Sequence, residues 1–316
     1  MKLVILALTL MSALVSASER VLIISPHGGL GNRLRSICNA IIISQQTGRK
    51  VYHTWIPLEV EHHTQHVKDA QLAGWKGYFK DSKDIPIATK KNVPLVDKCY
   101  SEWLPEHYWY KHQNIAQKIW CNNVDVSQVK ENVDAITTCG SRDHTILIET
   151  SMPIKLSVSA GGLTQDEHKT KMSEIYAQYF KPQSYYINVL DQLQSVDICI
   201  AIRRGDFLQY FKEAQQSLVD VGVWINNITT SVNEGDSKSF VIFSDDVALR
   251  DGLRDIYTES YTPKFPNNRK GKPWDSSFLE FLYLATKCQH IYGTPSSSFS
   301  QQAALFGNVY YDPIPI

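Results

Sequence analysis

The sequence lacks an excess of charge of either sign. Its 32 Lys and Arg residues balance 32 Asp and Glu residues, so the formal net charge at pH 7 is zero. A general nucleic-acid binder, or a protein that docks on an anionic membrane, carries a basic surplus. This absence disfavours both classes. Any anionic ligand must instead be bound by a local cluster of basic groups.

Long apolar runs are also missing after the first residues. Lys2 precedes an apolar run from Leu3 to Leu14, and Val15-Ser16-Ala17 has the small residues of a cleavage site. This pattern predicts a secretory signal peptide over residues 1–17, because a membrane span needs about 20 apolar residues. We expect a protein of the secretory pathway lumen (ER or Golgi) or a secreted one, without a stable membrane span. A buried N-terminal helix is the alternative.

Two familiar cofactor patterns are missing as well. The glycine spacing near residue 28 is not that of a dinucleotide-binding turn, and no acidic residue ends the next strand, which disfavours NAD. Four histidines in one region resemble metal ligands, but they lack a cysteine or acidic companion at a suitable spacing, so we expect solvated side chains and no metal site. These histidines are His53, His62, His63 and His66.

Strand and helix patterns alternate along both ends of the 316-residue chain. Short apolar strands are predicted at 21–24, 51–55, 198–202, 240–243 and 289–293, and helices at 34–47, 221–232, 247–253, 277–287 and 300–306. A further helix should begin at a capping box of Thr164 and Glu167 and end before Pro182. This alternation predicts an α/β fold with parallel sheets. From Glu59 to Gln183 the other signals are too short to predict a topology.

Length and pattern together predict two Rossmann-like domains that face a central cleft, residues 18–185 and 186–316.

The six cysteines permit 15 pairings. We expect Cys99, Cys121 and Cys139, in a polar region, to supply disulfides. Cys38, Cys199 and Cys288 lie in apolar segments and are predicted to be buried thiols. The sequon Asn227-Ile228-Thr229 matters only if the chain is secretory.

Polar stretches follow the predicted strands at the sheet edges where open α/β sheets bind ligands. The first is the glycine-rich turn 27–33, which lets backbone N–H groups approach an anion. The second is Arg203-Arg204-Gly205-Asp206, in which one guanidinium can bind phosphate while the Asp holds the other. For the turn 27–33, the alternative is a tight turn without a ligand. For residues 203–206, the alternative is an Arg–Asp ion pair within the protein.

Two more stretches complete the pattern. Residues 294–300 place consecutive hydroxyls and N–H groups at the start of the last helix, which suits a phosphate, although a simple N-cap is an equal alternative. Asp245 and Asp246 end the strand at 240–243, where a carboxylate can accept two N–H bonds from guanine. Solvation of the two carboxylates is the alternative.

Four short motifs in this order resemble the GDP-fucose-dependent fucosyltransferases of the α1,2-, α1,6- and protein O-fucosyltransferase superfamily. They are Gly-Gly-Leu-Gly-Asn at 28–32, Ile-Arg-Arg-Gly-Asp at 202–206, Phe-Ser-Asp-Asp at 243–246 and Ser-Ser-Phe-Ser at 297–300. The stretch 288–300 is most similar to the α1,2 group. The resemblance implies a GT-B-like fold and inverting transfer of fucose from GDP-fucose to a glycan or glycoprotein hydroxyl, with a galactoside favoured. It implies no metal and no cofactor besides the donor.

The resemblance also implies roles for individual residues. Arg203 matches the arginine that stabilises the leaving diphosphate, Asn32 belongs to the loop that faces sugar and acceptor, and Asp245 matches the acid that reads guanine. With Asp206, Arg203 and Asn32 are the expected catalytic residues. The expected substrate-binding residues are His27, Gly28, Gly29, Gly31, Arg33, Arg204, Asp245, Ser297, Ser298 and Phe299. Candidates for the general base are Asp206, His27 and Glu59, in falling order.

The chain departs from the family pattern at two places. Ala201 stands where the family often has a histidine, and Gln301-Gln302 replaces the Trp-Trp of the α1,2 group. Two other functions therefore stay open: a protein O-fucosyltransferase, and a silent nucleotide-sugar or glycan-binding protein on the same scaffold.

Overall fold

The computed structural model describes residues 20–26, 28–55, 75–87, 117–121, 124–125, 146–150, 162–204, 222–227, 239–266 and 274–314. Several predicted features lie outside these ranges: the signal peptide over residues 1–17, and His27, Glu59, His62, His63, His66, Cys99, Cys139 and Asp206. None of the helices within the described ranges combines the length and the apolar character of a membrane span.

The first sheet has five strands in the order β2-β1-β5-β3-β4. Strand β1 (Val21–Pro26), helix α2 (Leu30–Thr47) and strand β2 (Lys50–His53) form the predicted βαβ unit, and β1 and β2 are parallel. Helix α2 ends at Gly48, whose φ of 62° is the left-handed conformation that glycine adopts most easily. Strands β3 (Gln117–Cys121), β4 (Val124–Asp125) and β5 (Ile146–Thr150) come from the region without a predicted topology.

The second sheet is parallel throughout and has the order β7-β6-β8-β9. Its strands are β6 (Val196–Ile202), β7 (Phe240–Ser244), β8 (Cys288–Gly293) and β9 (Tyr310–Pro313). The connecting helices are α12 (Val247–Ile256), α13 (Trp274–Lys287) and α14 (Ser298–Gly307). The predicted strands and the helices α12, α13 and α14 are thus confirmed, and residues 222–227 of the predicted helix 221–232 are helical.

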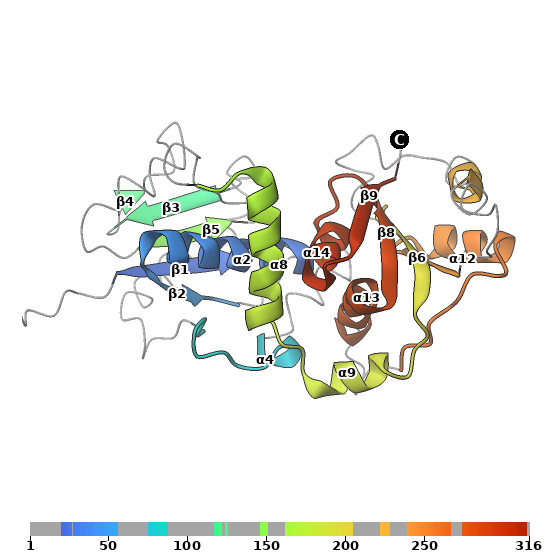
Figure 1. Cartoon of the computed structure of the whole chain (residues 1–316), viewed down its shortest axis with the longest axis horizontal. Helices are drawn as coiled ribbons and strands as arrows, with labels where there is room; N and C mark the ends of the chain where they lie inside the picture. The colour runs from blue at the N-terminus through green and yellow to red at the C-terminus, as the bar shows by residue number, and fades with distance from the viewer. Residues whose placement is uncertain are drawn as a thin grey trace, which may run out of the picture.

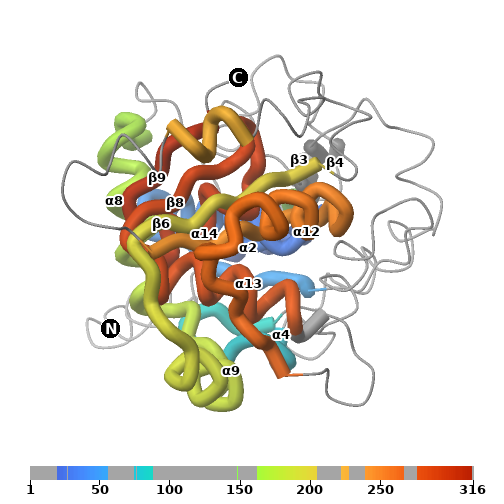
Figure 2. The backbone as a smooth tube through the Cα atoms, turned by 90° about the vertical axis from the view of Figure 1, so that its right-hand side faces the viewer, coloured from blue at the N-terminus to red at the C-terminus, as the bar shows by residue number. Residues whose placement is uncertain are grey.

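Helices α8 (Gln165–Tyr179) and α14 lie between the two sheets, and α2 runs along the first sheet with its N-terminal end against α14 (Figures 1 and 2). Helix α8 stands beside α2 and α14, and its Tyr176 hydroxyl donates to Gln302 of α14 at 2.6 Å. The predicted capping box is present, because Thr164 and Glu167 exchange both hydrogen bonds. Short helices α4 (Trp75–Tyr78) and α9 (Ser184–Leu190) extend the same layer.

One apolar core joins the helices of this layer to both sheets. Helix α13 is buried on more than one face, because its residues Phe278, Leu279 and Phe281–Ala285 are all buried. Tyr78 and Phe79 of the α4 region pack on Phe278, and their ring centroids lie 4.5 and 5.2 Å from that of Phe278, respectively. The two sheets therefore share a core, and the predicted division at residue 185 stays a prediction.

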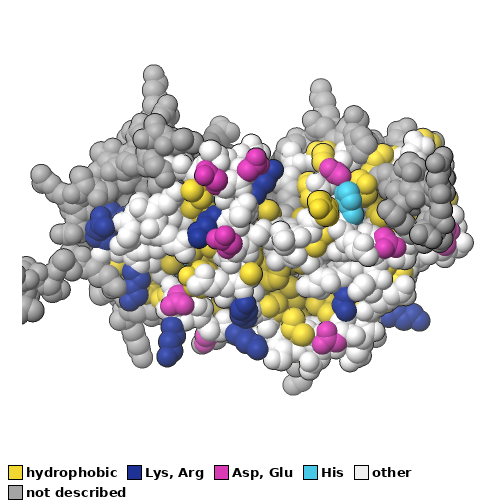
Figure 3. Space-filling view, viewed as in Figure 1, with side chains coloured by type: hydrophobic (Ala, Val, Ile, Leu, Met, Phe, Trp, Pro, Cys, Tyr) yellow, Lys and Arg dark blue, Asp and Glu magenta, His cyan; other side chains and the backbone are white. Residues whose placement is uncertain are grey.

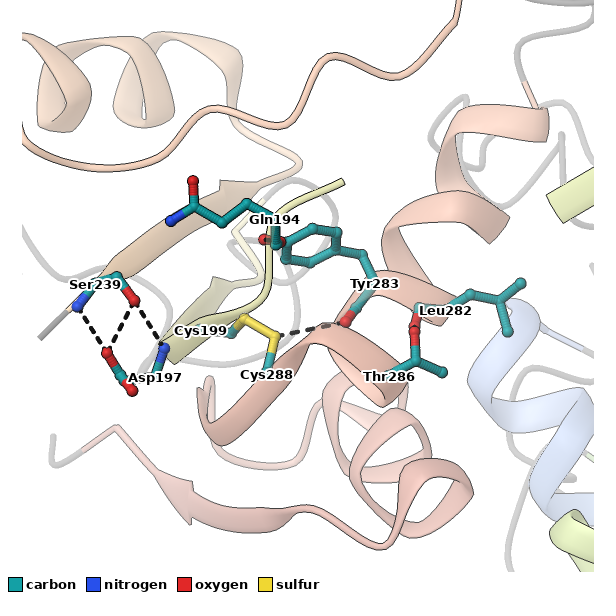
Figure 4. The surroundings of a disulfide bond; sticks show 8 residues. All are labelled: Gln194, Asp197, Cys199, Ser239, Leu282, Tyr283, Thr286 and Cys288. Carbon is teal, nitrogen blue, oxygen red and sulfur yellow. Dashed lines mark hydrogen bonds between the residues drawn. A yellow bond between two sulfur atoms is a disulfide. The ribbon is translucent and has the colours of Figure 1, made fainter. Parts of the chain in front are cut away.

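The prediction for two of the cysteines is wrong. Cys199 on β6 and Cys288 on β8 form a disulfide, with Cα atoms 5.8 Å apart (Figure 4). Strands β6 and β8 are parallel neighbours. The residue of β8 directly opposite Cys199 is Ile291, so the disulfide crosses between the strands to a cysteine three residues earlier on β8. An apolar environment suits a disulfide as well as a thiol, so burial alone could not distinguish the two. Cys38 is a buried thiol as predicted, and burial raises its pKa.

Candidate functional site

Two helices begin at the same place, one from each half of the chain. Helix α2 starts after Gly29 and helix α14 starts after Ser297, and neither of these N-cap residues caps its helix with a side-chain hydrogen bond. A Cβ on Gly31 would lie 2.5 Å from the backbone oxygen of Ser298, so only glycine permits this close approach. Two positive helix ends with uncapped N–H groups thus converge, which favours an anion.

The turn before α2 is shaped by Gly28 and Asn32. Gly28 has a φ of +79°, and a Cβ there would lie 2.9 Å from Nδ2 of Asn32. The Asn32 side chain therefore lies against the turn, and its Oδ1 accepts a hydrogen bond from Nη2 of Arg35 at 2.9 Å. This contact fixes the Asn32 side chain beside the loop that carries the predicted anion site.

Arg33, predicted to bind substrate, lies in the interior. Its side chain is fully buried, its Nε donates to the carbonyl oxygen of Gly28 at 2.9 Å, and its guanidinium lies 5.2 Å from the ring centroid of Trp55. Burial lowers the pKa of Arg33 to about 10, so the group is still charged at neutral pH. The geometry places Arg33 beneath the glycine-rich turn, where it holds the turn in shape.

Arg203 and Arg204 leave β6 and are organised by carboxylates of the neighbouring strand. Nε of Arg203 lies 3.0 Å from Oδ2 of Asp245, and the backbone N–H of Arg204 donates to Oδ1 at 2.7 Å. The Arg203 N–H also donates to Oγ1 of Thr294 at 2.8 Å. The Arg204 guanidinium lies 3.6 Å from Asp246. The Arg–Asp pairing considered from the sequence is therefore present, with Asp245 and Asp246 as the acids.

A pocket opens where these parts meet, with about 630 Å³ of space that includes its open, solvent-filled mouth. It is lined by Gly29 and Leu30 of the first half and by Arg203, Asp245, Ser297, Phe299 and Ser300 of the second, with Tyr78, Ala201, Ile202, Ser277 and Glu280. Five predicted site residues thus come together. The predicted residues Gly28, Gly31, Asn32, Arg33, Arg204 and Ser298 do not line the pocket.

The turn between β8 and α14 shows backbone strain at the pocket wall. Ser296 has a φ of 63°, which non-glycine residues seldom adopt, and the Ser297 N–H donates to the carbonyl oxygen of Thr294 at 3.1 Å. Ser297 itself is 3% exposed. The turn therefore presents the start of α14 to the pocket in a fixed orientation.

Glu280 is a pocket residue that the sequence analysis missed. Burial, and next the charge of Asp245, raise the pKa of Glu280 to about 7, against the opposing effects of Arg250, Arg203 and Arg254. Such a perturbed carboxylate in a pocket marks a candidate functional group. The sequence did hold a signal, because Glu280 interrupts the apolar run from Phe278 to Ala285, whose other residues are buried.

The histidine prediction is wrong for His53. Its side chain is 1% exposed, its ring centroid lies 4.6 Å from that of Trp75, and burial lowers its pKa to about 3. His53 is therefore a neutral core residue and not a solvated one. Within the described ranges, no three His, Cys, Asp or Glu side chains are grouped as a metal site requires.

Comparisons with known proteins agree with this geometry. The family model described as glycosyl transferase family 11 matches residues 174–308. No curated protein matches the chain. The α-1,6-fucosyltransferase NodZ from Bradyrhizobium, solved with GDP-fucose, aligns with a TM-score of 0.54 and 16% identity over 91% of this chain and 92% of its own.

Two further solved structures are similar. A point mutant of Arabidopsis thaliana FUT1 in complex with GDP gives a TM-score of 0.57 at 14% identity over 97% of this chain and 72% of its own. POFUT1 in complex with GDP-fucose gives 0.50 at 9% identity over 96% and 99%. These likenesses confirm the predicted GT-B-like α/β fold and, with the family model, the resemblance to the GDP-fucose-dependent superfamily.

Proposed function

We propose, from the match of residues 174–308 to glycosyl transferase family 11, that this chain transfers fucose from GDP-fucose to a hydroxyl of a glycan, with inversion at the sugar carbon. One observation carries the proposal: two uncapped helix starts and the Arg203 guanidinium meet at a pocket built from both halves of the chain. That arrangement suits a diphosphate whose sugar projects between the halves.

The pocket residues act on the charge of the leaving group. As the bond between fucose and phosphate breaks, negative charge grows on GDP and positive character on the sugar. Arg203, held by Asp245, and the N–H groups at the starts of α2 and α14 would stabilise the diphosphate without reorganising. The acceptor oxygen attacks from the opposite face and its proton passes to a base. The candidate bases Asp206, His27 and Glu59 lie outside the described residues.

Two carboxylates of the pocket are candidates to read guanine. Asp245 was the predicted reader, but both of its oxygens already lie against Arg203 and the N–H of Arg204. Glu280 is the other carboxylate of the pocket wall. A carboxylate can accept two N–H bonds from the guanine edge, so we assign this role to Glu280 and the support of Arg203 to Asp245.

The acceptor is proposed from sequence motifs alone. The stretch 288–300 favours an α1,2-type galactoside. A folded protein domain is the second candidate, because the motifs resemble the protein O-fucosyltransferases as well. A silent binding protein would bind GDP-fucose without turnover. An acceptor panel of β-galactosides and folded small domains, with release of GDP as the readout, separates these three functions.

The compartment is proposed as the lumen of the secretory pathway or the extracellular space. The signal-peptide pattern over residues 1–17 and the disulfide between Cys199 and Cys288 both support it, because disulfides persist in oxidising compartments. We also propose that transfer needs no metal, since Arg203 and backbone N–H groups can neutralise the diphosphate.

The donor assignment is tested by thermal shift. GDP at one hundred times its Kd should stabilise the protein by about 2.7 kcal/mol, and UDP and ADP at the same concentration should have much smaller effects. The Glu280→Gln variant should lose the preference for GDP, and the exposed-site variant Glu174→Gln should keep it. Equal shifts from the three nucleotides would overturn the guanine assignment.

A further inference from the structure

A row of aromatic rings crosses the outer edge of the second sheet, away from the residues that line the pocket. Tyr310 on edge strand β9 lies beside His290 on β8, with ring centroids 6.3 Å apart. His290 stacks on Tyr292 at 4.3 Å and 7°, and Tyr292 meets the edge of Trp224 at 5.5 Å. We call these four residues, with Asp312, the ring row.

The ring row is open to solvent at its β9 end. Tyr310 is 80% exposed, the most exposed of the large hydrophobic residues described. Figure 3 shows hydrophobic side chains gathered around a histidine and an acidic side chain over β8 and β9. An exposed aromatic group rimmed by polar atoms marks an interaction site more often than scattered apolar residues do.

Polar groups of the ring row are held in place. Nε2 of His290 lies 2.9 Å from Oδ2 of Asp312, whose side chain is 59% exposed. This pair can offer hydrogen bonds to a ligand beside the Tyr310 ring. The described charge beside the rings is the Asp312 carboxylate, and within the described ranges no lysine or arginine makes an ion pair or a ring contact with these five residues. A neutral ligand therefore suits the ring row better than an anion.

We propose that the ring row is a binding site for a neutral oligosaccharide, separate from the donor pocket. The face of an aromatic ring packs against the C–H groups of a pyranose, and fixed carboxylate and imidazole groups bond its hydroxyls. A protein partner would need about 800 Å² of surface on this side, whereas the row offers a single highly exposed ring. The Tyr310 ring offers a face to one sugar unit, and the His290–Asp312 pair beside it offers hydrogen bonds to the same unit or to its neighbour in the chain.

Such a site would hold a glycan chain independently of turnover. None of its residues lines the donor pocket, although β8 runs from Tyr292 directly into the Thr294 turn that supports Arg203. The ring row therefore would tether long or branched glycans to the sheet that holds the donor. This inference does not require that the chain be a fucosyltransferase.

The test measures sugar binding in the full chain without GDP-fucose. Saturation-transfer NMR and calorimetry are run with three probes: chitotetraose, maltotetraose and a neutral tetrasaccharide of galactose and N-acetylglucosamine. We expect at least one probe to bind, Tyr310→Ala to weaken that binding at least ~10-fold, and Tyr310→Phe to keep it. Asp312→Asn should weaken it to a lesser degree.

The control variant is Ile256→Ala, which removes an exposed apolar side chain (59%) on α12 beside the opposite edge strand, β7. It should bind the sugar normally. GDP binding by thermal shift should be unchanged in Tyr310→Ala, which shows that the fold and the donor pocket are intact. Absence of binding by all three probes, equal binding by Tyr310→Ala, or a Tyr310-dependent dimer in sedimentation would overturn the proposal. A chain that binds sugar at the ring row but not GDP would overturn only the proposed function.

Discussion

Replacement of Glu280 by glutamine should make the protein more stable and less able to bind GDP. Burial and the charge of Asp245 raise the pKa of Glu280 from 4.5 to about 7 in the folded state. The folded protein therefore holds this proton more tightly than the unfolded chain does. The contribution of Glu280 to the free energy of unfolding is therefore expected to fall as the pH rises from 4.5 to 7, on the order of 3 kcal/mol in total, because each pKa unit corresponds to about 1.4 kcal/mol.

Glutamine resembles the protonated acid, so Glu280→Gln should escape this loss. At pH 8 we expect the variant to be more stable than the wild type by up to about 3 kcal/mol, and its Tm to be about 5–10 °C higher. At pH 4 the two proteins should melt together. If Glu280 reads guanine, the GDP affinity of the wild type should also fall below pH 7 as the carboxylate takes up a proton.

The assay is thermal denaturation from pH 4 to pH 8, with and without GDP. Glu174→Gln is the matched control, because Glu174 is exposed and its ion pair among the described residues is with Lys171 of its own helix. Its stability should differ little from that of the wild type at any pH. A Glu280→Gln variant that melts at or below the wild-type temperature at pH 8 would show that the carboxylate is stabilised by its arginine neighbours, and the reasoning would be refuted.

Three other predictions concern the same pocket. Gly31→Ala should push α14 away from α2, lower the free energy of unfolding by about 1–2 kcal/mol and weaken GDP binding at least ~10-fold. The control is Gly222→Ala, whose new Cβ would lie 3.9 Å from its nearest neighbour, and calorimetry should show its unfolding unchanged. Arg203→Lys should lower kcat at least ~10²-fold, and Arg204→Lys should lower it less, because the Arg204 side chain faces Asp246. If steady-state kinetics show the larger loss for Arg204→Lys, Arg204 and not Arg203 stabilises the diphosphate. Transfer should survive EDTA, and loss of turnover restored by Mn²⁺ would contradict the arginine-based mechanism.

Local patterns in the sequence were sufficient for most of the secondary structure. The helix from Leu30 to Thr47, its end at Gly48 and the capping box at Thr164 depend on residues within a few positions of one another. The same holds for the parallel strands, whose apolar runs reflect burial on both faces. Such signals survive in a single sequence because each is confined to one element.

The composition of the site could be predicted only in part. The motifs marked Gly29, Arg203, Asp245, Ser297 and Phe299, and these residues do line one pocket. Their partners could not be predicted from spacing. Asp245 lies 41 positions from Arg204, and the approach of Gly31 to Ser298 joins the two ends of the chain.

Tertiary packing alone decided what several ambiguous residues do. It buried Arg33 beneath the turn, made His53 a neutral core residue, joined Cys199 to Cys288 and placed Glu280 in the pocket wall. Charge, pKa and disulfide pairing depend on the neighbours that a side chain meets in space and on its exposure to water. The sequence by itself determined which elements form and where polar groups leave the strands. Only the packing of α2 and α13 against α14, and of these helices on the sheets, determined which of those groups meet.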